Sequence, residues 1–195
     1  MKRLFDILLS LIFLALLWPV FLLFAIWIAF DSKGGIFYSQ FRVGRHNKDF
    51  RMFKFRTMRT GADAAGLLTV GGRDPRVTRA GYYLRKVKLD ELPQLINILK
   101  GEMSFVGPRP EVRKYVDLYT KEQMEVLQVR PGLTDYASLE YFEENKLLEN
   151  SDDPEKTYIE EIMPAKLSLN MKYIRERSLF VDFGIIFKTI ARIFA

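Results

Sequence analysis

Residues 7–30, ILLSLIFLALLWPVFLLFAIWIAF, decide the fold class of this chain because they carry no charged side chain. At about 1.5 Å per residue, a helix of that length reaches about 36 Å, and the hydrocarbon core of a bilayer is roughly 30 Å thick. A cleaved signal peptide would have a shorter apolar region followed by a small-residue cleavage site. Neither feature is present, so the run predicts a helix embedded in a membrane.

Basic residues flank the apolar run on both sides: Lys2, Arg3, Lys33, Arg42 and Arg45. Positive charge favours the cytoplasmic side, so a helix that satisfies both flanks must turn back within the membrane. Trp18 and Pro19 stand in the middle of the run, and proline removes a backbone hydrogen bond and bends a helix. Proline is also tolerated in ordinary membrane helices. These residues leave two alternatives open, a re-entrant helical hairpin and a single kinked span.

The rest of the composition limits the available chemistry. The chain has 195 residues and a net charge of +6, which indicates an anionic partner such as a phosphorylated molecule, a nucleic acid or a membrane surface. It contains no cysteine and one histidine, His46, which excludes thiolate chemistry and argues against Ser-His catalysis. Any reaction must therefore use carboxylates, Arg, Lys, hydroxyls or a bound metal.

Beyond the apolar run, the pattern predicts a small, mostly helical α+β domain. Residues 36–43 and 50–55 are rich in β-branched and aromatic side chains and predict a β-hairpin. Residues 61–81 are glycine-rich and predict a loop. We therefore expect two units, a membrane helix over residues 1–31 and a catalytic domain over residues 32–195.

Three further helices are predicted in this domain. One spans about residues 112–129, and one begins at Pro154 after a capping aspartate. The last stretch, 179–195, is a basic amphipathic helix. Such a helix lies either in the membrane interface or against a protein core, and the pattern fits both.

An acidic pair, Asp90 and Glu91, precedes apolar residues that repeat at helical spacing from Leu92 to Leu99, and Gly101 is predicted to end that helix. Carboxylates in a first helical turn are ordinary capping chemistry. This pair, however, is accompanied by many cations: Lys54, Arg56, Arg79, Arg85, Lys86, Lys88 and Arg109. Such donors suit a diphosphate, Mg²⁺ binds through one or two carboxylates plus phosphates, and a carboxylate can attack phosphorus. The stretch predicts phosphoryl transfer at a membrane surface, and a solvated basic face that binds anionic lipids is the alternative.

Five motifs stand in order along the chain: KRLFD at 2–6, KFRTM at 54–58, DPRVTRAG at 74–81, LDELPQLINILKGEMSFVGPRPE at 89–111 and RPGLT at 130–134. They resemble the motifs of the bacterial sugar transferase family, the small monotopic polyprenyl-phosphate phosphoglycosyl transferases. The resemblance implies transfer of a phosphosugar from a UDP-sugar to undecaprenyl phosphate at the cytoplasmic face of the bacterial inner membrane. The products are an undecaprenyl-diphosphate sugar and UMP, at the first membrane step of capsule, O-antigen or glycoprotein synthesis. It also implies a re-entrant N-terminal helix, with Trp18 and Pro19 at its break.

The resemblance also implies residue roles. Asp90 is the expected nucleophile that holds a covalent phosphosugar, and Glu91 is the expected Mg²⁺ ligand beside it, with Asp90 as the second ligand. The remaining expected substrate-binding residues are Arg85 and Arg109 at the phosphates, Pro108 near the uridine, Lys54 and Arg56 at the hairpin end, and Asp182. A nucleophile in this role must be reachable from the lipid boundary.

Some positions depart from the family pattern. Lys88 stands where small hydroxyl residues are common, and the sequence after Thr134 diverges. Two rivals stay open: direct transfer in a ternary complex with the acids only as metal ligands, and a non-catalytic module that binds anionic lipids. Membrane lipids are expected partners and nucleic acid is not, while the sugar, the pathway and a homodimer are left undecided.

Overall fold

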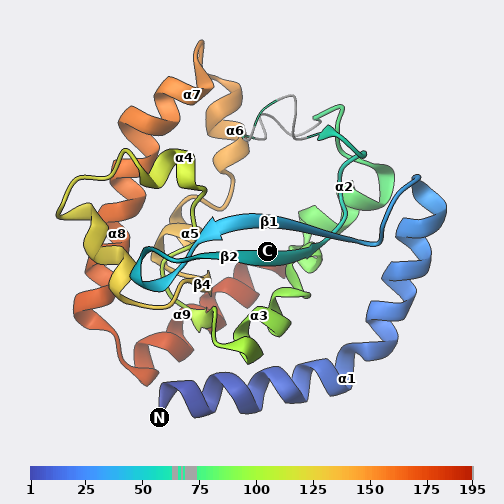
Figure 1. The fold of residues 1–195 in the computed structure, drawn as a ribbon, viewed down its shortest axis with the longest axis horizontal. Coiled ribbons are helices and arrows are strands. Elements are labelled where there is room, and N and C mark those ends of the chain that lie inside the picture. Colours follow the sequence, from blue (N-terminus) through green and yellow to red (C-terminus); the bar gives the residue numbers. More distant parts are fainter. Residues whose placement is uncertain (63–65, 67, 69–73, 195) are drawn as a thin grey trace.

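The computed structural model describes residues 1–62, 66, 68 and 74–194. In this part of the chain helices dominate and strands are few, which confirms a mostly helical protein with a small β-hairpin (Figure 1). The predicted loop at residues 61–81 lies partly outside the described residues. Its described end, from Asp74 to Thr78, forms a turn and one bridge between Val77 and Met58 before helix α2 (Arg79–Lys86) begins.

Helix α1 (Lys2–Asp31) contains the whole apolar run and keeps Pro19 in its interior. Figure 1 shows a sharp bend in α1, with one arm beneath the rest of the protein and the other rising along its side. A proline inside a helix is a known cause of such a bend. Among the described residues, α1 is the one helix long and apolar enough to cross a membrane. Only 11% of the residues in its most apolar 18-residue segment are buried in the protein.

The first turn of α1 is anchored to the domain by polar side chains. Lys2 Nζ donates to Val106 O and to the Tyr173 hydroxyl, each at 2.9 Å, and forms an ion pair with Asp182. Arg3 Nη2 donates to Leu99 O at 2.8 Å. One turn later, Asp6 Oδ1 accepts from Ser104 Oγ at 3.0 Å and from the Phe105 N–H at 3.2 Å.

The last turn of α1 is anchored to the same domain by different residues. Arg56 is buried and donates to the carbonyl oxygen of Ser32, the C-cap residue of α1, at 2.6 Å and to that of Lys33, the next residue. A helix end leaves its last carbonyls, including that of the C-cap, without a partner inside the helix. Asp31 Oδ2 accepts from the Ala80 N–H at 3.0 Å. Phe24 and Ile28 pack into a core cluster with the hairpin and α2. Both ends of one long apolar helix therefore contact the same domain.

The predicted hairpin is confirmed as β1 (Phe37–Val43) and β2 (Asp49–Phe55), which pair antiparallel from Phe37–Phe55 to Val43–Asp49. A short 3₁₀ turn, η1 (Arg45–Asn47), joins the strands. The pattern did not predict a second pairing, in which β3 (Ser104–Val106) runs parallel to β4 (Gly132–Thr134). Here the backbones approach so closely that a Cβ on Gly132 would lie 2.1 Å from Gly107 N.

The remaining elements are short helices and turns, followed by two longer helices at the C-terminal end. They are η3 (Leu89–Glu91), α3 (Gln94–Lys100), α4 (Arg113–Val116), η4 (Gln123–Gln128), α5 (Tyr136–Glu140), α6 (Glu144–Glu149), α7 (Pro154–Thr157), η5 (Tyr158–Ile162), α8 (Met163–Glu176) and α9 (Leu179–Phe194). Gly101 ends α3 with φ 86°, and Asp153 caps α7 through the Lys156 N–H at 3.0 Å, as predicted.

The single helix predicted over residues 112–129 is wrong, because two short helices occupy this stretch. Thr120 and Gln123 exchange side-chain to backbone hydrogen bonds, Gln123 Oε1 accepting from the Thr120 N–H at 2.8 Å and Thr120 Oγ1 from the Gln123 N–H at 3.3 Å. This reciprocal capping box starts a new helical turn and interrupts the first.

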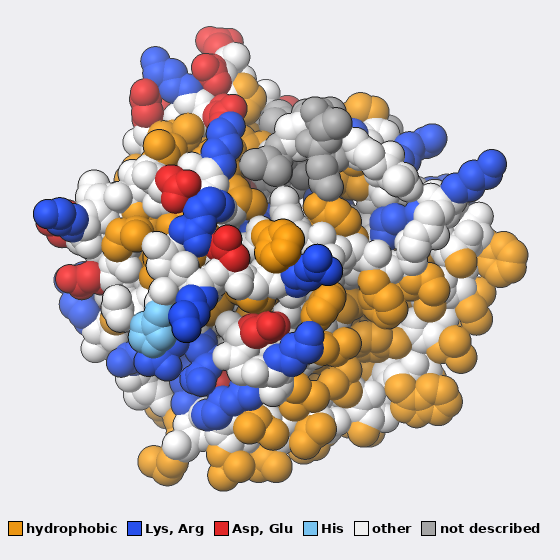
Figure 2. Space-filling model, viewed as in Figure 1, with side chains coloured by type: hydrophobic (Ala, Val, Ile, Leu, Met, Phe, Trp, Pro, Cys, Tyr) orange, Lys and Arg blue, Asp and Glu red, His pale blue; other side chains and the backbone are white. Residues whose placement is uncertain are grey.

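Exposed apolar side chains are concentrated on two helices. Figure 2 shows orange side chains gathered over the region where α1 lies in Figure 1, with charged side chains on the opposite part of the view. Helix α9 exposes Phe180 and Phe187, at 88% and 79%, while Ile185 on its other face is 1% exposed. The last helix therefore packs on the core with one face and exposes the other, and its place in a membrane interface stays a prediction. Large exposed apolar surfaces of this kind indicate contact with a membrane or a partner.

Candidate active site

The acidic pair lies on the 3₁₀ turn η3, directly before α3, and both side chains are buried. Asp90 is 4% exposed and Glu91 is 7% exposed. The turn follows Lys88, whose φ of 56° places it in the left-handed region that few non-glycine residues occupy. Pro93 caps α3, so the acidic pair precedes this helix. The prediction that the pair lies in the first turn of the helix is therefore wrong.

Glu91 is held by two cations from distant parts of the chain. Lys54 Nζ at the end of β2 donates to Glu91 Oε1 at 2.8 Å, and Arg109 grips both carboxylate oxygens, with Nη1 to Oε2 at 3.2 Å. Burial alone would raise the pKa of Glu91, but the charges of Arg109 and Lys54 outweigh it and hold that pKa well below its usual range. Glu91 is therefore an ionised carboxylate, and in return it raises the pKa of the Arg109 guanidinium.

Asp90 has a different environment although it is the next residue. Its Oδ2 lies 4.0 Å from Lys54 Nζ. Burial raises the pKa of Asp90, the negative charge of Glu91 adds to this, and Lys54 and Arg85 oppose it. Two adjacent carboxyls whose pKa values are pushed apart are typical of sites with separate chemical roles.

The backbone around Arg109 is fixed from both sides. Its N–H donates to Asp135 Oδ2 at 3.1 Å, and Asp135 also caps α5 by accepting from the Ser138 N–H at 2.6 Å. On the other side, Gly107 and Gly132 bring the two loops into direct backbone contact. Asp135 is 0% exposed, and its contact with Arg109 was not predicted from the sequence. In the sequence it looks like an ordinary aspartate at the start of a helix, which caps the helix and has no further role.

A cavity of about 560 Å³ connects this polar cluster to the apolar helices. Asp90 and Glu91 lie on its wall although they expose little surface, so a bound molecule can reach them. Its polar wall also contains Lys54, Arg85, Lys88, Arg109 and Glu111, and its apolar wall contains Leu9, Phe13 and Leu17 of α1 and Ile186, Ile190 and Ile193 of α9. The cavity can therefore hold an anionic group and an apolar chain at the same time.

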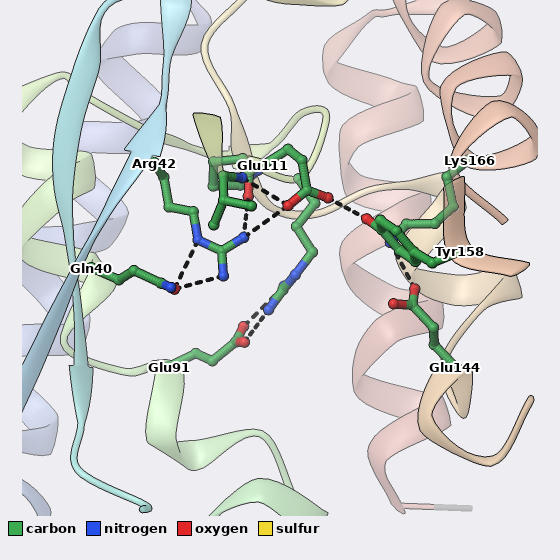
Figure 3. A network of polar contacts seen from close by, with 10 residues as sticks. Gln40, Arg42, Glu91, Glu111, Glu144, Tyr158 and Lys166 are labelled. Atoms are coloured by element: carbon green, nitrogen blue, oxygen red, sulfur yellow. Dashed lines mark hydrogen bonds and ion pairs between the residues drawn. The ribbon is translucent and has the colours of Figure 1, made fainter. Parts of the chain in front are cut away.

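A second polar network lines another part of the same cavity (Figure 3). Glu111 accepts from Arg42 Nη1 at 3.2 Å and from the Tyr158 hydroxyl, and Arg42 is steadied by Gln40 Oε1 at 2.8 Å. Lys166 lies over the Tyr158 ring, with Nζ 5.2 Å from its centroid. Burial and the negative charge of Glu111 raise the pKa of Tyr158, which therefore stays a protonated donor.

Comparison with known proteins identifies the family. The bacterial sugar transferase family matches residues 1–195.

This chain belongs to the bacterial sugar transferase family.

Curated relatives agree with this assignment. The chain is 38% identical over 195 residues to the UDP-N-acetylgalactosamine-undecaprenyl-phosphate N-acetylgalactosaminephosphotransferase of Aeromonas hydrophila, covering 98% of this chain and 43% of that protein. It is 37% identical to the exopolysaccharide production protein ExoY of Rhizobium meliloti (strain 1021), covering 97% and 83%. It is 36% identical to the UDP-glucose:undecaprenyl-phosphate glucose-1-phosphate transferase of Xanthomonas campestris pv. campestris, covering 98% and 38%. The chain thus spans less than half the length of two of these relatives.

The bacterial sugar transferase structure brings five of the expected site residues to one cavity. These are Asp90, Glu91, Lys54, Arg85 and Arg109. Pro108 lines a small adjoining pocket with Arg109. Arg56 and Asp182 make the contacts with the two ends of α1 described above, and neither is on the wall of the large cavity. Trp18 lies beside Pro19 in α1 and is 64% exposed.

The donor set of this chain suits Mg²⁺ only together with a phosphorylated ligand. Within the described residues no group of three or more His, Asp or Glu side chains could hold a metal ion. Asp90 and Glu91 provide two adjacent carboxylates on the cavity wall. Mg²⁺ commonly takes one or two carboxylates and completes its shell with water and substrate phosphates, so the residues fit that kind of site.

Proposed function

We propose that this protein is a phosphoglycosyl transferase that moves a phosphosugar from a UDP-sugar to undecaprenyl phosphate, giving undecaprenyl-diphosphate sugar and UMP. The reaction would be the first membrane step of a glycoconjugate pathway. Family membership supports it, as do relatives named for this chemistry. The observation that carries it is the cavity, because its acidic and basic cluster opens between the apolar side chains of α1 and α9.

The donor diphosphate would bind at the cations of the cavity wall. Arg109 and Lys54 are already oriented by Glu91, and the Arg109 guanidinium has N–H groups beyond the two that bind Glu91, which can donate to phosphate oxygens. Arg85 lies on the same wall. Because Asp90 and Glu91 are only 4% and 7% exposed, the charges beside them act in a low-dielectric environment and stabilise negative charge on the transferring group.

In the first step, a carboxylate oxygen of Asp90 attacks the phosphorus nearer the sugar. An O–P bond to Asp90 forms, the P–O bond to UMP breaks, and UMP leaves with the electron pair. In the second step, a phosphate oxygen of undecaprenyl phosphate attacks the same phosphorus. The bond to Asp90 breaks, the carboxylate is restored, and the lipid diphosphate sugar leaves.

Mg²⁺ is the expected cofactor, held by Asp90 and Glu91 together with the donor phosphates. When bound it supplies positive charge that neutralises the diphosphate. Glu91 suits this role because its low pKa keeps it ionised. Arg109 suits the complementary role of holding phosphate oxygens from the other side of Glu91.

For the membrane helix, we favour the re-entrant topology with the catalytic domain at the cytoplasmic face. A straight helix of 30 residues would be about 45 Å long and would carry its two ends to opposite faces of a bilayer. Here Lys2 at one end and Asp31 at the other both bind the same domain. A bent helix anchored in this way satisfies the basic residues at both flanks.

Release of UMP from a panel of UDP-sugars tests this function. The purified protein is supplied with Mg²⁺ and undecaprenyl phosphate, and relatives named for N-acetylgalactosamine and for glucose make both sugars first choices. We expect Mg²⁺-dependent UMP release with at least one sugar and none with Asp90→Asn, since an amide is a poor nucleophile. A lipid-binding module without catalysis would release no UMP with any sugar. Direct transfer in a ternary complex would release no UMP until the lipid is added.

A further inference from the structure

Lys88 differs from the other cations of the cavity. It stands two residues before Asp90 in a left-handed conformation, with φ 56° and ψ 18°. Lys54 and Arg109 both bind Glu91, whereas no carboxylate among the described residues lies within 4.0 Å of Lys88 Nζ. A left-handed backbone is unfavourable for a side chain such as lysine and persists where the surrounding structure imposes it. The fold therefore holds a cation without a carboxylate partner beside the proposed nucleophile.

The direction of the Lys88 side chain is given by an aromatic contact. Its Nζ lies 5.1 Å from the centroid of the Phe142 ring. The guanidinium of Arg192, on α9, lies 5.8 Å from the centroid of the same ring. Cations are attracted to the face of an aromatic ring at these distances. Phe142 thus contacts both a cation from the catalytic turn and a cation from the last helix.

Phe142 lies where the cavity borders the apolar helices. Lys88 and Phe142 line the cavity together with Ile190 and Ile193 of α9, and Arg192 contacts Phe142 without being on the cavity wall. The same helix exposes Phe183 and Phe187 at 49% and 79%. An amphiphile with an apolar chain along α9 would therefore bring its charged head to Lys88 and Arg192.

We propose that Lys88 and Arg192, gathered at Phe142, form the subsite that receives the phosphate of the lipid acceptor and delivers it to Asp90. The ligand class is the phosphomonoester of a long-chain lipid. This assignment rests on the proposed function and adds the acceptor site to it. It separates the cations by role: Lys54 and Arg109 hold the donor, and Lys88 with Arg192 holds the acceptor.

The two half-reactions separate these roles in an experiment. The enzyme in detergent is mixed with the best UDP-sugar, and the UMP burst without lipid measures the donor step. Turnover against undecaprenyl phosphate concentration then gives the acceptor KM. The informative variant is Lys88→Asn, because asparagine removes the charge yet tolerates the left-handed backbone. Lys88→Arg restores the charge, and Lys86→Asn is the matched control, since Lys86 is exposed and is not on the cavity wall.

Loss of a charge-assisted contact to phosphate predicts a rise of about tenfold or more in the acceptor KM of Lys88→Asn. The UMP burst and the donor KM should stay within about twofold of the wild type by the same reasoning. Arg192→Gln and Phe142→Leu should raise the acceptor KM by smaller factors. Lys88→Arg should have an acceptor KM close to that of the wild type, and Lys86→Asn should leave the acceptor KM unchanged.

Three results would overturn the acceptor assignment. One is an unchanged acceptor KM in Lys88→Asn, the second is a raised donor KM with a normal acceptor KM, and the third is an equal effect from Lys86→Asn. A wild-type protein that releases no UMP with any sugar would instead contradict the proposed function itself, so the two failures are distinguishable.

Discussion

Replacement of Gly132 by alanine should destabilise the protein and disturb the position of Arg109. A Cβ on this residue would lie 2.1 Å from Gly107 N and 2.5 Å from Gly107 O, and both are backbone atoms that no rotamer change can move. Overpacking of a dense region costs about 1–3 kcal/mol, and a backbone obstacle places this variant at the upper end. For a chain of this size 1 kcal/mol corresponds to about 2–4 °C, so we expect Tm to fall by roughly 6–12 °C.

The matched control is Gly184→Ala in α9. Neither glycine has a positive φ, and a Cβ on Gly184 would meet nothing within 4 Å. Alanine is favoured over glycine inside a helix by about 1 kcal/mol, so this variant should keep or slightly raise Tm. Thermal unfolding in detergent, followed by tryptophan fluorescence, measures both. Because the loop of Gly107 carries Arg109, Gly132→Ala should also raise the donor KM. Equal Tm values for the two variants would refute the close contact between the loops.

Two further predictions concern ionised groups. The pKa of Glu91 is lower in the folded state than its ordinary value of about 4.5. Ionised Glu91 therefore stabilises the fold at pH values above about 4.5, and this contribution is lost as the pH falls through the folded-state pKa. In metal-free protein, the Tm of Glu91→Gln should therefore fall less than the Tm of the wild type when the pH is lowered below about 4.5. Asp182→Asn and Lys2→Met should each lower Tm, and the double variant should lose less than the sum of both, because they remove the same ion pair.

Each of these has a clear contrary outcome. An identical pH slope in Glu91→Gln would show that the cations around Glu91 do not set its pKa. Fully additive losses from Asp182→Asn and Lys2→Met would show that the ion pair does not anchor α1.

The sequence predicted the features that depend on local pattern. The uncharged run became α1, the aromatic strands became β1 and β2, and Gly101 ended α3. The acidic pair and its cations were identified as one group, and Lys54 and Arg109 indeed contact Glu91.

Features that depend on distant contacts could not be predicted. The parallel strands β3 and β4 have three residues each, which is too few for an alternating pattern. Residues 107–131 separate them in the sequence, so their pairing depends on a distant contact. Asp135 reads as an ordinary helix cap, and its bond to Arg109 depends on the loop contact at Gly107 and Gly132. Arg56 was expected at the substrate, and a motif does not reveal that its guanidinium reaches the carbonyl oxygens of Ser32 and Lys33, directly after α1.

The central claim is that Asp90 carries the phosphosugar between the two substrates, and mass spectrometry of the protein tests it most directly. The enzyme is incubated with Mg²⁺ and the active UDP-sugar without lipid, quenched, digested and sequenced by fragmentation. We predict one added phosphosugar on the peptide that contains Asp90, its disappearance on addition of undecaprenyl phosphate, and its absence in Asp90→Asn. Turnover at the normal rate with no adduct on Asp90, or an adduct on a different residue, would contradict the account.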